Sequence, residues 1–275
     1  MENKWVKKIL KIIFCLSSAI TIYPLLWLFL NSLKNTGEIL TGNSFGLPKV
    51  LTFKGYVTSV IDYNILKYFF NSVMVTVCTI LLTVVLSTML AYSLARMNWK
   101  LKGAALNYVL LGVLLPSQIV IVPVFMIIRA VGLVNSPLSL ILTVSAFTLA
   151  MSTLIAYGFL RGIPKEMEEA AVMDGCGLLK LFFTIILPII KPAVATMGIN
   201  IFIHSWNEFL YALILISKDS VRTLPIALMS FVGRYGTDWT SIFAAMVIAS
   251  IIPVVIFLIF SSQVEKALTA GAILK

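Results

Sequence analysis

Long apolar stretches recur along the chain, and short polar segments rich in glycine, proline or charge separate them. Because the hydrocarbon core of a bilayer is roughly 30 Å thick, a helix crosses it with about 20 apolar residues. This pattern predicts an all-α membrane protein in which residues 1–275 form a single transmembrane domain. The six predicted transmembrane helices cover residues 9–33, 71–95, 104–129, 137–160, 188–213 and 241–262.

The composition agrees with a membrane location. Hydrophobic residues make up 60% of the chain and charged residues only 12%, so the polar residues are too few to cover a soluble domain of this size. A net charge of +10 would suggest nucleic acid as the partner of a soluble protein, but basic residues in membrane proteins mark the cytoplasmic loops. We therefore expect a multi-pass protein of the cell membrane, surrounded by lipid, with both termini in the cytoplasm and no nucleic-acid partner.

The N-terminal segment allows two interpretations. Ser17 and Ala19 form a possible cleavage site for a signal peptide. The apolar run, however, continues as far as Leu30, which is longer than the apolar region of a signal peptide. The length of the run favours a first span that is retained.

Two outer connections and one interrupted span are predicted. Residues 34–67 form a long, turn-rich connection, and residues 224–231 in the second outer connection are expected to form a short helix near the membrane surface. The third span contains Pro116 and Pro123. Because proline lacks the backbone N–H that a helix needs, we expect a kink in this span.

The fifth span is the most polar one, and it carries Asn200, His204, Asn207 and Glu208. Ionisable groups within a membrane are costly and usually face a cavity or a partner group. Asn200, Asn207 and Glu208 are therefore candidates for the lining or outer gate of a translocation path. A structural network with neighbouring backbone groups is an equally open interpretation, and His204 is more typical of a packing residue than of a ligand.

The motifs of several enzyme classes are absent from the sequence. The chain has no phosphate-binding GxxxxGK[ST] loop, no HExxH, no GxSxG and no CxxC, and it contains a single histidine. No catalytic residue, no metal site and no cofactor is predicted. The three cysteines are scattered, so the sequence predicts neither a disulfide framework nor a zinc site.

The inner loop at residues 161–187 has an unusual pattern for so apolar a chain. Pro164 suits the first turn of a helix, and Glu166, Glu168 and Glu169 would lie near its positive end. Gly175 and Gly177 can both adopt the left-handed conformation that ends a helix. The pattern predicts a short cytoplasmic helix that docks into another protein or, equally, an ordinary amphipathic loop helix.

The same loop resembles the EAA signature of permease subunits from binding-protein-dependent ABC importers. The signature consists of Glu169-Ala170-Ala171, a glycine four residues later at Gly175, and Ile185, Leu187 and Pro188 at the expected spacing. Segments such as "SWNEFLYALIL", "TLPIALMSF" and "LTAGAILK" resemble the maltose-transporter-type branch, which takes up carbohydrates. Two positions depart from the family pattern, since Cys176 replaces the usual alanine and Glu208 replaces the usual aspartate.

The resemblance implies a type I ABC importer permease fold with a cytoplasmic coupling helix. It further implies a second, homologous permease subunit, two ATPase subunits that carry out ATP hydrolysis, an extracytoplasmic sugar-binding protein and a sugar substrate. The residues implied to dock on the ATPase subunits are Glu169, Ala170, Ala171, Asp174, Gly175, Leu187 and Pro188. The C-terminal segment 268–271 is expected to contact the same subunits.

Two other functions remain open. A stand-alone secondary carrier or channel would also have several apolar spans, but it would not need a docking helix. A permease of the same family could instead transport a polar solute other than a sugar. The sequence cannot choose among the substrates, because the binding protein contributes much of their selection.

Overall fold

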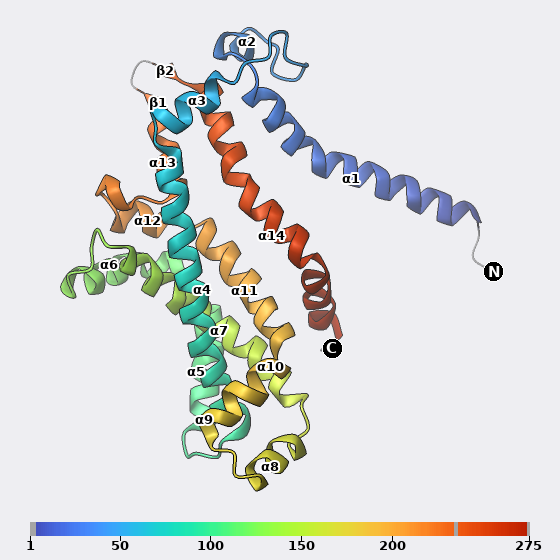
Figure 1. Cartoon of the computed structure of the whole chain (residues 1–275), viewed down its shortest axis with the longest axis vertical. Coiled ribbons are helices and arrows are strands. Elements are labelled where there is room, and N and C mark those ends of the chain that lie inside the picture. Colours follow the sequence, from blue (N-terminus) through green and yellow to red (C-terminus); the bar gives the residue numbers. More distant parts are fainter. Residues whose placement is uncertain (1–3, 234–235, 274–275) are drawn as a thin grey trace. The chain divides into compact units, whose positions relative to one another are not determined.

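The computed structural model describes residues 4–233 and 236–273, and it is mainly helical (Figure 1). The helices in the first half of the chain are α1 (Lys4–Ser32), α2 (Thr36–Leu40), α3 (Lys54–Ile61), α4 (Ile65–Arg96), α5 (Lys102–Leu114), η1 (Ser117–Val120) and α6 (Ile121–Ala130). The next helices are α7 (Pro137–Arg161), α8 (Glu166–Met173), α9 (Leu178–Leu181), the π-helix η2 (Phe182–Ile186), α10 (Leu187–Ile189) and α11 (Lys191–Trp206). The last elements are α12 (Leu210–Leu215), η3 (Asp219–Val221), α13 (Leu224–Ala227), η4 (Leu228–Phe231), the two short paired strands β1 (Val232–Gly233) and β2 (Gly236–Thr237), and α14 (Trp239–Ile273).

Four of the described helices are long and apolar enough to cross a membrane. They are α1, α4, α7 and the part of α14 up to Phe260. Two further pairs of helices meet the same criteria together, although each pair is sharply bent. If each bent pair is one span, the described residues contain six spans, which agrees with the fold class expected from the sequence.

The predicted kink in the third span lies at Pro116. Helix α5 ends at Leu114, Pro116 follows with an extended backbone, and the next helices leave at an angle of 93°. Pro123 lies in the first turn of α6, where its missing N–H costs no helical hydrogen bond. Only one of the two prolines therefore interrupts the helix.

The predicted fifth span is divided twice. Helices α9 to α10 and helix α11 meet at an angle of 77°, and α11 then ends at Trp206, before α12 begins at Leu210. Asn207 and Glu208 lie in this second break. The predicted short helix at residues 224–231 is confirmed as α13 and η4.

The described chain divides into two compact units. The first unit comprises residues 1–67 and 227–252, and the second comprises residues 68–226 and 253–275. In the first unit, Thr240 at the start of α14 holds the connection that follows α1, because its Oγ1 bonds the Lys34 carbonyl (3.0 Å) and the Thr36 hydroxyl (2.9 Å). Edge-to-face packing of Trp27 on Phe243 adds an apolar contact, with the ring centroids 5.2 Å apart.

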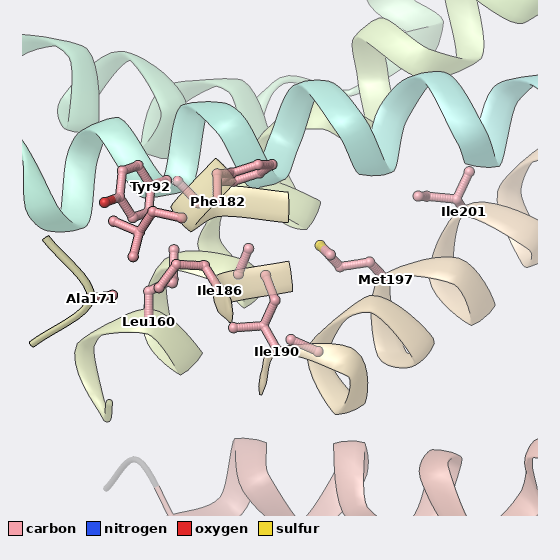
Figure 2. Close-up of a cluster of buried hydrophobic side chains, with 12 residues drawn as sticks. Tyr92, Leu160, Ala171, Phe182, Ile186, Ile190, Met197 and Ile201 are labelled. Carbon is pink, nitrogen blue, oxygen red and sulfur yellow. The ribbon is translucent and has the colours of Figure 1, made fainter. Parts of the chain in front are cut away.

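The second unit has two separate groups of buried apolar side chains. One group gathers around Tyr211 on α12, with members on α4, α6 and α7; it consists of Val75, Ile128, Leu140, Ile141, Tyr211, Ala212, Leu215, Ile216 and Ile226. The other group, which we call the inner cluster, joins α4, α7 and α11 to the loop that contains α8 (Figure 2). Its members are Ala91, Tyr92, Ala156, Leu160, Ala171, Leu181, Phe182, Ile186, Ile190, Ala193, Met197 and Ile201.

Helix α7 lies at the centre of the second unit, in contact with both α5 and α11. Small side chains permit the close approach of α5, since a Cβ atom built on Gly112 would lie only 3.1 Å from the Cβ of Ala150. Close packing through small residues is typical of helices in membranes, where lipid does not drive apolar surfaces together. Because α11 also packs on α7, the loop that precedes α11 is held against the same central helix.

Candidate functional site: the inner loop and the broken helices

The inner loop forms the helix that the sequence predicts. Helix α8 begins at Glu166, so Pro164, which was expected in the first turn, lies just before the helix. All three glutamates lie in the first turn, near the positive end of the helix dipole. Gly175 ends the helix with φ = +77°, in the left-handed region that glycine adopts without strain. The amides of Gly175 and Cys176 donate to the carbonyls of Val172 (2.9 Å) and Ala171 (3.0 Å). This pattern is typical of a helix that ends at a glycine.

The second glycine of the loop has a different role. Gly177 has φ = −69° and precedes α9, so its backbone conformation is open to any residue. The left-handed conformation expected at both glycines is therefore confirmed at Gly175 and wrong at Gly177. The direction of the chain after α8 depends on this one position.

Most of the residues implied to dock lie on the outside of the loop. The side chains of Glu169, Ala170 and Asp174 are exposed, as is Gly175. Ala171 differs from them, because it is buried and belongs to the inner cluster, where Figure 2 shows it beside Leu160. The structure thus assigns two faces to α8, one open to contact and one packed on the second unit.

The loop returns to the membrane through an irregular helix. The Leu187 amide donates to the Phe182 carbonyl five residues earlier, which makes residues 182–186 a π-helix. Phe182 and Ile186 are both buried in the inner cluster, Leu187 is half-buried against it, and Pro188 is exposed. Leu187 and Pro188 therefore lie where the loop joins the body of the unit.

A buried ion pair joins α8 to the end of α4, and the sequence analysis missed it. Glu168 Oε1 lies 2.6 Å from Arg96 Nε, and the Tyr92 hydroxyl donates to Glu168 Oε2 over 3.1 Å. Arg96 Nη2 also donates to the Ile163 carbonyl, at 2.8 Å. The available signal was the position of Glu168 three residues before Ala171, which places both on the same face of the helix.

The polar residues of the fifth span lie at its second break. The Asn207 side chain is exposed, and its Nδ2 donates to the Ile203 carbonyl (2.9 Å) at the end of α11. Glu208 Oε1 accepts a hydrogen bond from the Tyr211 amide (2.8 Å) at the start of α12. Both side chains thus satisfy backbone groups that a broken helix leaves free. Asn200 lies half-buried on α11, two turns before the break.

The two broken spans meet each other. The Tyr211 hydroxyl on α12 donates to the Ser117 carbonyl, which directly follows the bend at Pro116, over 2.6 Å. Phe147 of α7 stacks on the Tyr211 ring, with the centroids 5.5 Å apart. The structure therefore brings together two interruptions that are 94 residues apart in the sequence. Irregular backbone in membrane proteins is tolerated where it is buried in protein or lines a cavity.

Side chains that could bind a metal ion are scattered over the described residues. Among them, no group of three or more His, Cys, Asp or Glu side chains is close enough to hold a metal ion. The three cysteines are free, with Cys15 exposed and Cys78 and Cys176 half-buried.

Comparison with known proteins points to one family. The family model described as "Binding-protein-dependent transport system inner membrane component" matches residues 83–270. The sulfoquinovosyl glycerol transport system permease protein SmoH of Agrobacterium fabrum is 33% identical over 92% of this chain and 88% of its own. The diacetylchitobiose uptake system permease protein NgcG of Streptomyces coelicolor is 34% identical over 92% of this chain and 84% of its own.

The fold also matches a solved structure. The crystal structure of a bacterial ABC transporter involved in the import of the acidic polysaccharide alginate contains a chain that aligns with a TM-score of 0.84. The alignment covers 96% of this chain and 98% of the other, at 19% sequence identity. At this identity the likeness concerns the fold.

Proposed function

Because the chain belongs to the family of inner membrane components of binding-protein-dependent transport systems, we propose that it is the permease subunit of an ATP-driven sugar importer. Membership makes the chain a transport subunit of a membrane complex, and not an enzyme. The observation that carries the proposal is the inner loop: α8 presents exposed acidic and small residues on one face and is anchored to the second unit by the other.

The proposed substrate class is a sugar linked to another group, such as a disaccharide or an oligosaccharide. The two relatives are named for sulfoquinovosyl glycerol and diacetylchitobiose, which both contain a glycosidic bond. A polar solute other than a sugar is the alternative within the family. In either case, the extracytoplasmic binding protein that delivers the substrate would contribute most of the substrate selectivity.

The proposed assembly contains a second homologous permease, two ATPase subunits and the extracytoplasmic binding protein. In this proposal Glu169, Ala170, Asp174 and Gly175 contact an ATPase subunit, since all four are exposed on the loop. Ala171 and Leu187 pack against the inner cluster and so hold the loop in place, whereas Pro188 is exposed and remains a docking residue in this proposal. Both termini would lie in the cytoplasm, and the end of α14, residues 268–271, would approach the ATPase subunits.

The proposed translocation path runs past the meeting point of the two broken spans. Asn207 has an exposed side chain there, and Glu208 and Asn200 lie on the same span. Hydroxyl groups of a sugar are recognised by amide, carboxylate and backbone groups. The hydrogen bonds of Asn207 and Glu208 to backbone groups also support a structural role at the break in the helix. That role is compatible with lining the translocation path.

The docking role of α8 can be tested at Gly175. Replacing Gly175 with valine forces a β-branched residue into a left-handed backbone, at a cost of about 1–2 kcal/mol, and this should redirect the chain after α8. We expect at least a fivefold loss of ATP-dependent sugar uptake in vesicles that contain the assembled complex, and less co-purified ATPase. The measurements are uptake of radiolabelled sugar and subunit stoichiometry.

The matched control is Gly177→Ala. Gly177 has an ordinary φ, and a Cβ atom there would meet nothing within 4 Å, so uptake should stay near the wild-type rate. Normal uptake by a well-expressed Gly175→Val complex would contradict the docking role. Uptake that needs neither ATP nor the ATPase subunits would instead support a stand-alone carrier.

A further inference from the structure

The end of α4 and the side of α8 that faces it share a buried polar contact. The Arg96 and Glu168 side chains keep only 8% and 11% of their surface exposed, and they form the 2.6 Å ion pair described above. Both oxygens of the carboxylate are engaged, one by Arg96 and the other by Tyr92. We refer to these three residues as the α4–α8 link.

The link is directional in a way that apolar packing is not. A guanidinium and a carboxylate hold each other in a fixed geometry, and charge-assisted hydrogen bonds are roughly twice as strong as neutral ones. Arg96 also bonds the Ile163 carbonyl, which lies just before α8 in the chain. The last turn of α4 is therefore tied to both the helix and the segment that leads into it.

The neighbouring glutamates do not share this arrangement. Glu166 and Glu169 belong to the same turn of α8, and both are exposed. Only Glu168 faces the body of the unit, on the same side as Ala171. The burial of a charged group is costly unless it is paired, so the Glu168 carboxylate depends on its contacts with Arg96 and Tyr92.

Helix α8 needs such an attachment in order to move as part of a larger body. It has only eight residues, and helices of this length are unstable without tertiary contacts. Helix α4, in contrast, has 32 residues and contributes Ala91 and Tyr92 to the inner cluster. Figure 2 shows the Tyr92 ring beside Phe182, so the same tyrosine contacts both the cluster and the ion pair.

We propose that the Arg96–Glu168 ion pair, together with the Tyr92 hydroxyl, is the rigid connection through which a displacement of α8 is transmitted to α4. The proposal rests on the function proposed above, in which α8 docks on an ATPase subunit. It assigns Arg96, Glu168 and Tyr92 as positioning residues. Without the link, α8 still docks and ATP is still hydrolysed, but less of the movement reaches the transmembrane helices.

The test is the number of sugar molecules imported per ATP hydrolysed by the assembled complex in vesicles. Glu168→Gln keeps the shape of the side chain and removes the charge that Arg96 binds. Hydrogen bonds to charged groups contribute more than neutral ones, and we expect the ratio to fall about tenfold. Co-purification of the ATPase subunits and the rate of ATP hydrolysis should stay within about twofold of wild type, because the exposed face of α8 is intact.

Tyr92→Phe is a milder variant that keeps the ring in the inner cluster. It removes only the hydroxyl group that donates to Glu168, so the complex should fold and the ratio should fall about threefold. The matched control is Glu166→Gln, which neutralises an exposed glutamate in the same turn and should leave the ratio unchanged. A loss of thermal stability with an unchanged ratio would show a structural role only and would overturn the proposal.

Two results separate this proposal from the proposed function. Suppose that Glu168→Gln and Tyr92→Phe both import as much sugar per ATP hydrolysed as the wild type, while Gly175→Val loses uptake. Docking through α8 is then supported, and the proposed role of the α4–α8 link is wrong. If the wild-type complex imports sugar without ATP hydrolysis, the proposed function itself fails and the link fails with it.

Discussion

At the scale of single residues, Gly55 determines how closely helix α3 approaches the start of α14. A Cβ atom built on Gly55 would lie 2.6 Å from the Thr240 carbonyl oxygen and 2.7 Å from Thr240 Cγ2. A hydrogen bond adds to this contact, because the Ser59 hydroxyl donates to the Ser241 carbonyl over 2.8 Å. Backbone atoms cannot move aside as the end of a side chain can, so the position requires glycine.

Gly55→Ala should therefore destabilise the first unit. The added methyl group forces α3 away from Thr240, and overpacking of this kind typically costs about 1–3 kcal/mol. The expected result is a lower melting temperature of the purified protein in detergent. Gly37→Ala is the control, because Gly37 lies in α2 and a Cβ atom there would meet nothing within 4 Å, so its melting temperature should equal that of wild type or exceed it slightly. An equal loss in both variants would refute the steric explanation.

At the scale of elements, two charged residues organise the connection after α1. Lys34 is fully buried, and its Nζ donates to the Asn43 carbonyl (2.7 Å) and to Asn31 Oδ1 (3.1 Å). Burial lowers the pKa of Lys34, although the nearby Glu38 opposes this shift. Glu38 Oε1 accepts hydrogen bonds from the Lys49 amide (2.8 Å) and from Asn43 Nδ2 (2.5 Å). Asn43 is thus held from both sides.

This arrangement predicts that the stability of the connection after α1 depends on pH. The Lys49 amide, followed by Asn43 and the charges of Lys34 and Lys49, lowers the pKa of Glu38 below its ordinary value of 4.5. Because the folded loop favours the ionised carboxylate, this stabilisation is present above pH 4.5 and is lost as the pH falls through the lowered pKa. The Glu38→Gln variant should lack this stabilisation at every pH.

Hydrogen exchange at the Lys49 amide can measure this effect. After correction for the intrinsic rate, protection should fall about threefold to fivefold in Glu38→Gln at pH 7, and in wild type at low pH. Asp62→Asn, which removes an exposed carboxylate in the same connection, should keep the wild-type protection. Equal protection in Glu38→Gln and wild type at neutral pH would show that the carboxylate does not organise the loop.

At the scale of the whole molecule, the orientation in the membrane remains a prediction. The basic residues favour cytoplasmic termini, which would place α8 inside the cell and the connection after α1 outside it. The same orientation is required if α8 is to reach ATPase subunits in the cytoplasm. The structure supplies exposed positions at which this can be tested without disturbing the fold.

Cysteine labelling with a membrane-impermeant reagent tests the orientation directly. In a background without the three native cysteines, Thr41→Cys should react from outside, whereas Lys100→Cys and Lys180→Cys should react only after the membrane is opened. All three side chains are exposed. Thr41 is preferred to Asn43, because Asn43 holds the loop together. Labelling of residue 180 from outside would reverse the orientation and exclude the proposed contact with ATPase subunits.

The sequence by itself determined the apolar helices, the C-terminal end of α8 and the bend in the third span, whereas the two breaks in the fifth span were not predicted. These features are local: hydropathy marks a span, Pro116 removes a helical hydrogen bond, and Gly175 adopts a left-handed conformation. A local pattern is enough to predict each of them.

Only the tertiary structure decided which side of each element is covered. The motif includes Ala171 among the docking residues, but in the structure Ala171 is buried in the inner cluster. Glu168 lies on the same side of α8 and contacts Arg96, 72 positions earlier in the chain. The meeting of Tyr211 with Ser117 and the approach of Gly55 to Thr240 also join residues that are far apart in the sequence. Such pairs depend on how helices pack across the fold, and hydropathy and turn signals carry no information about partners so distant in the chain.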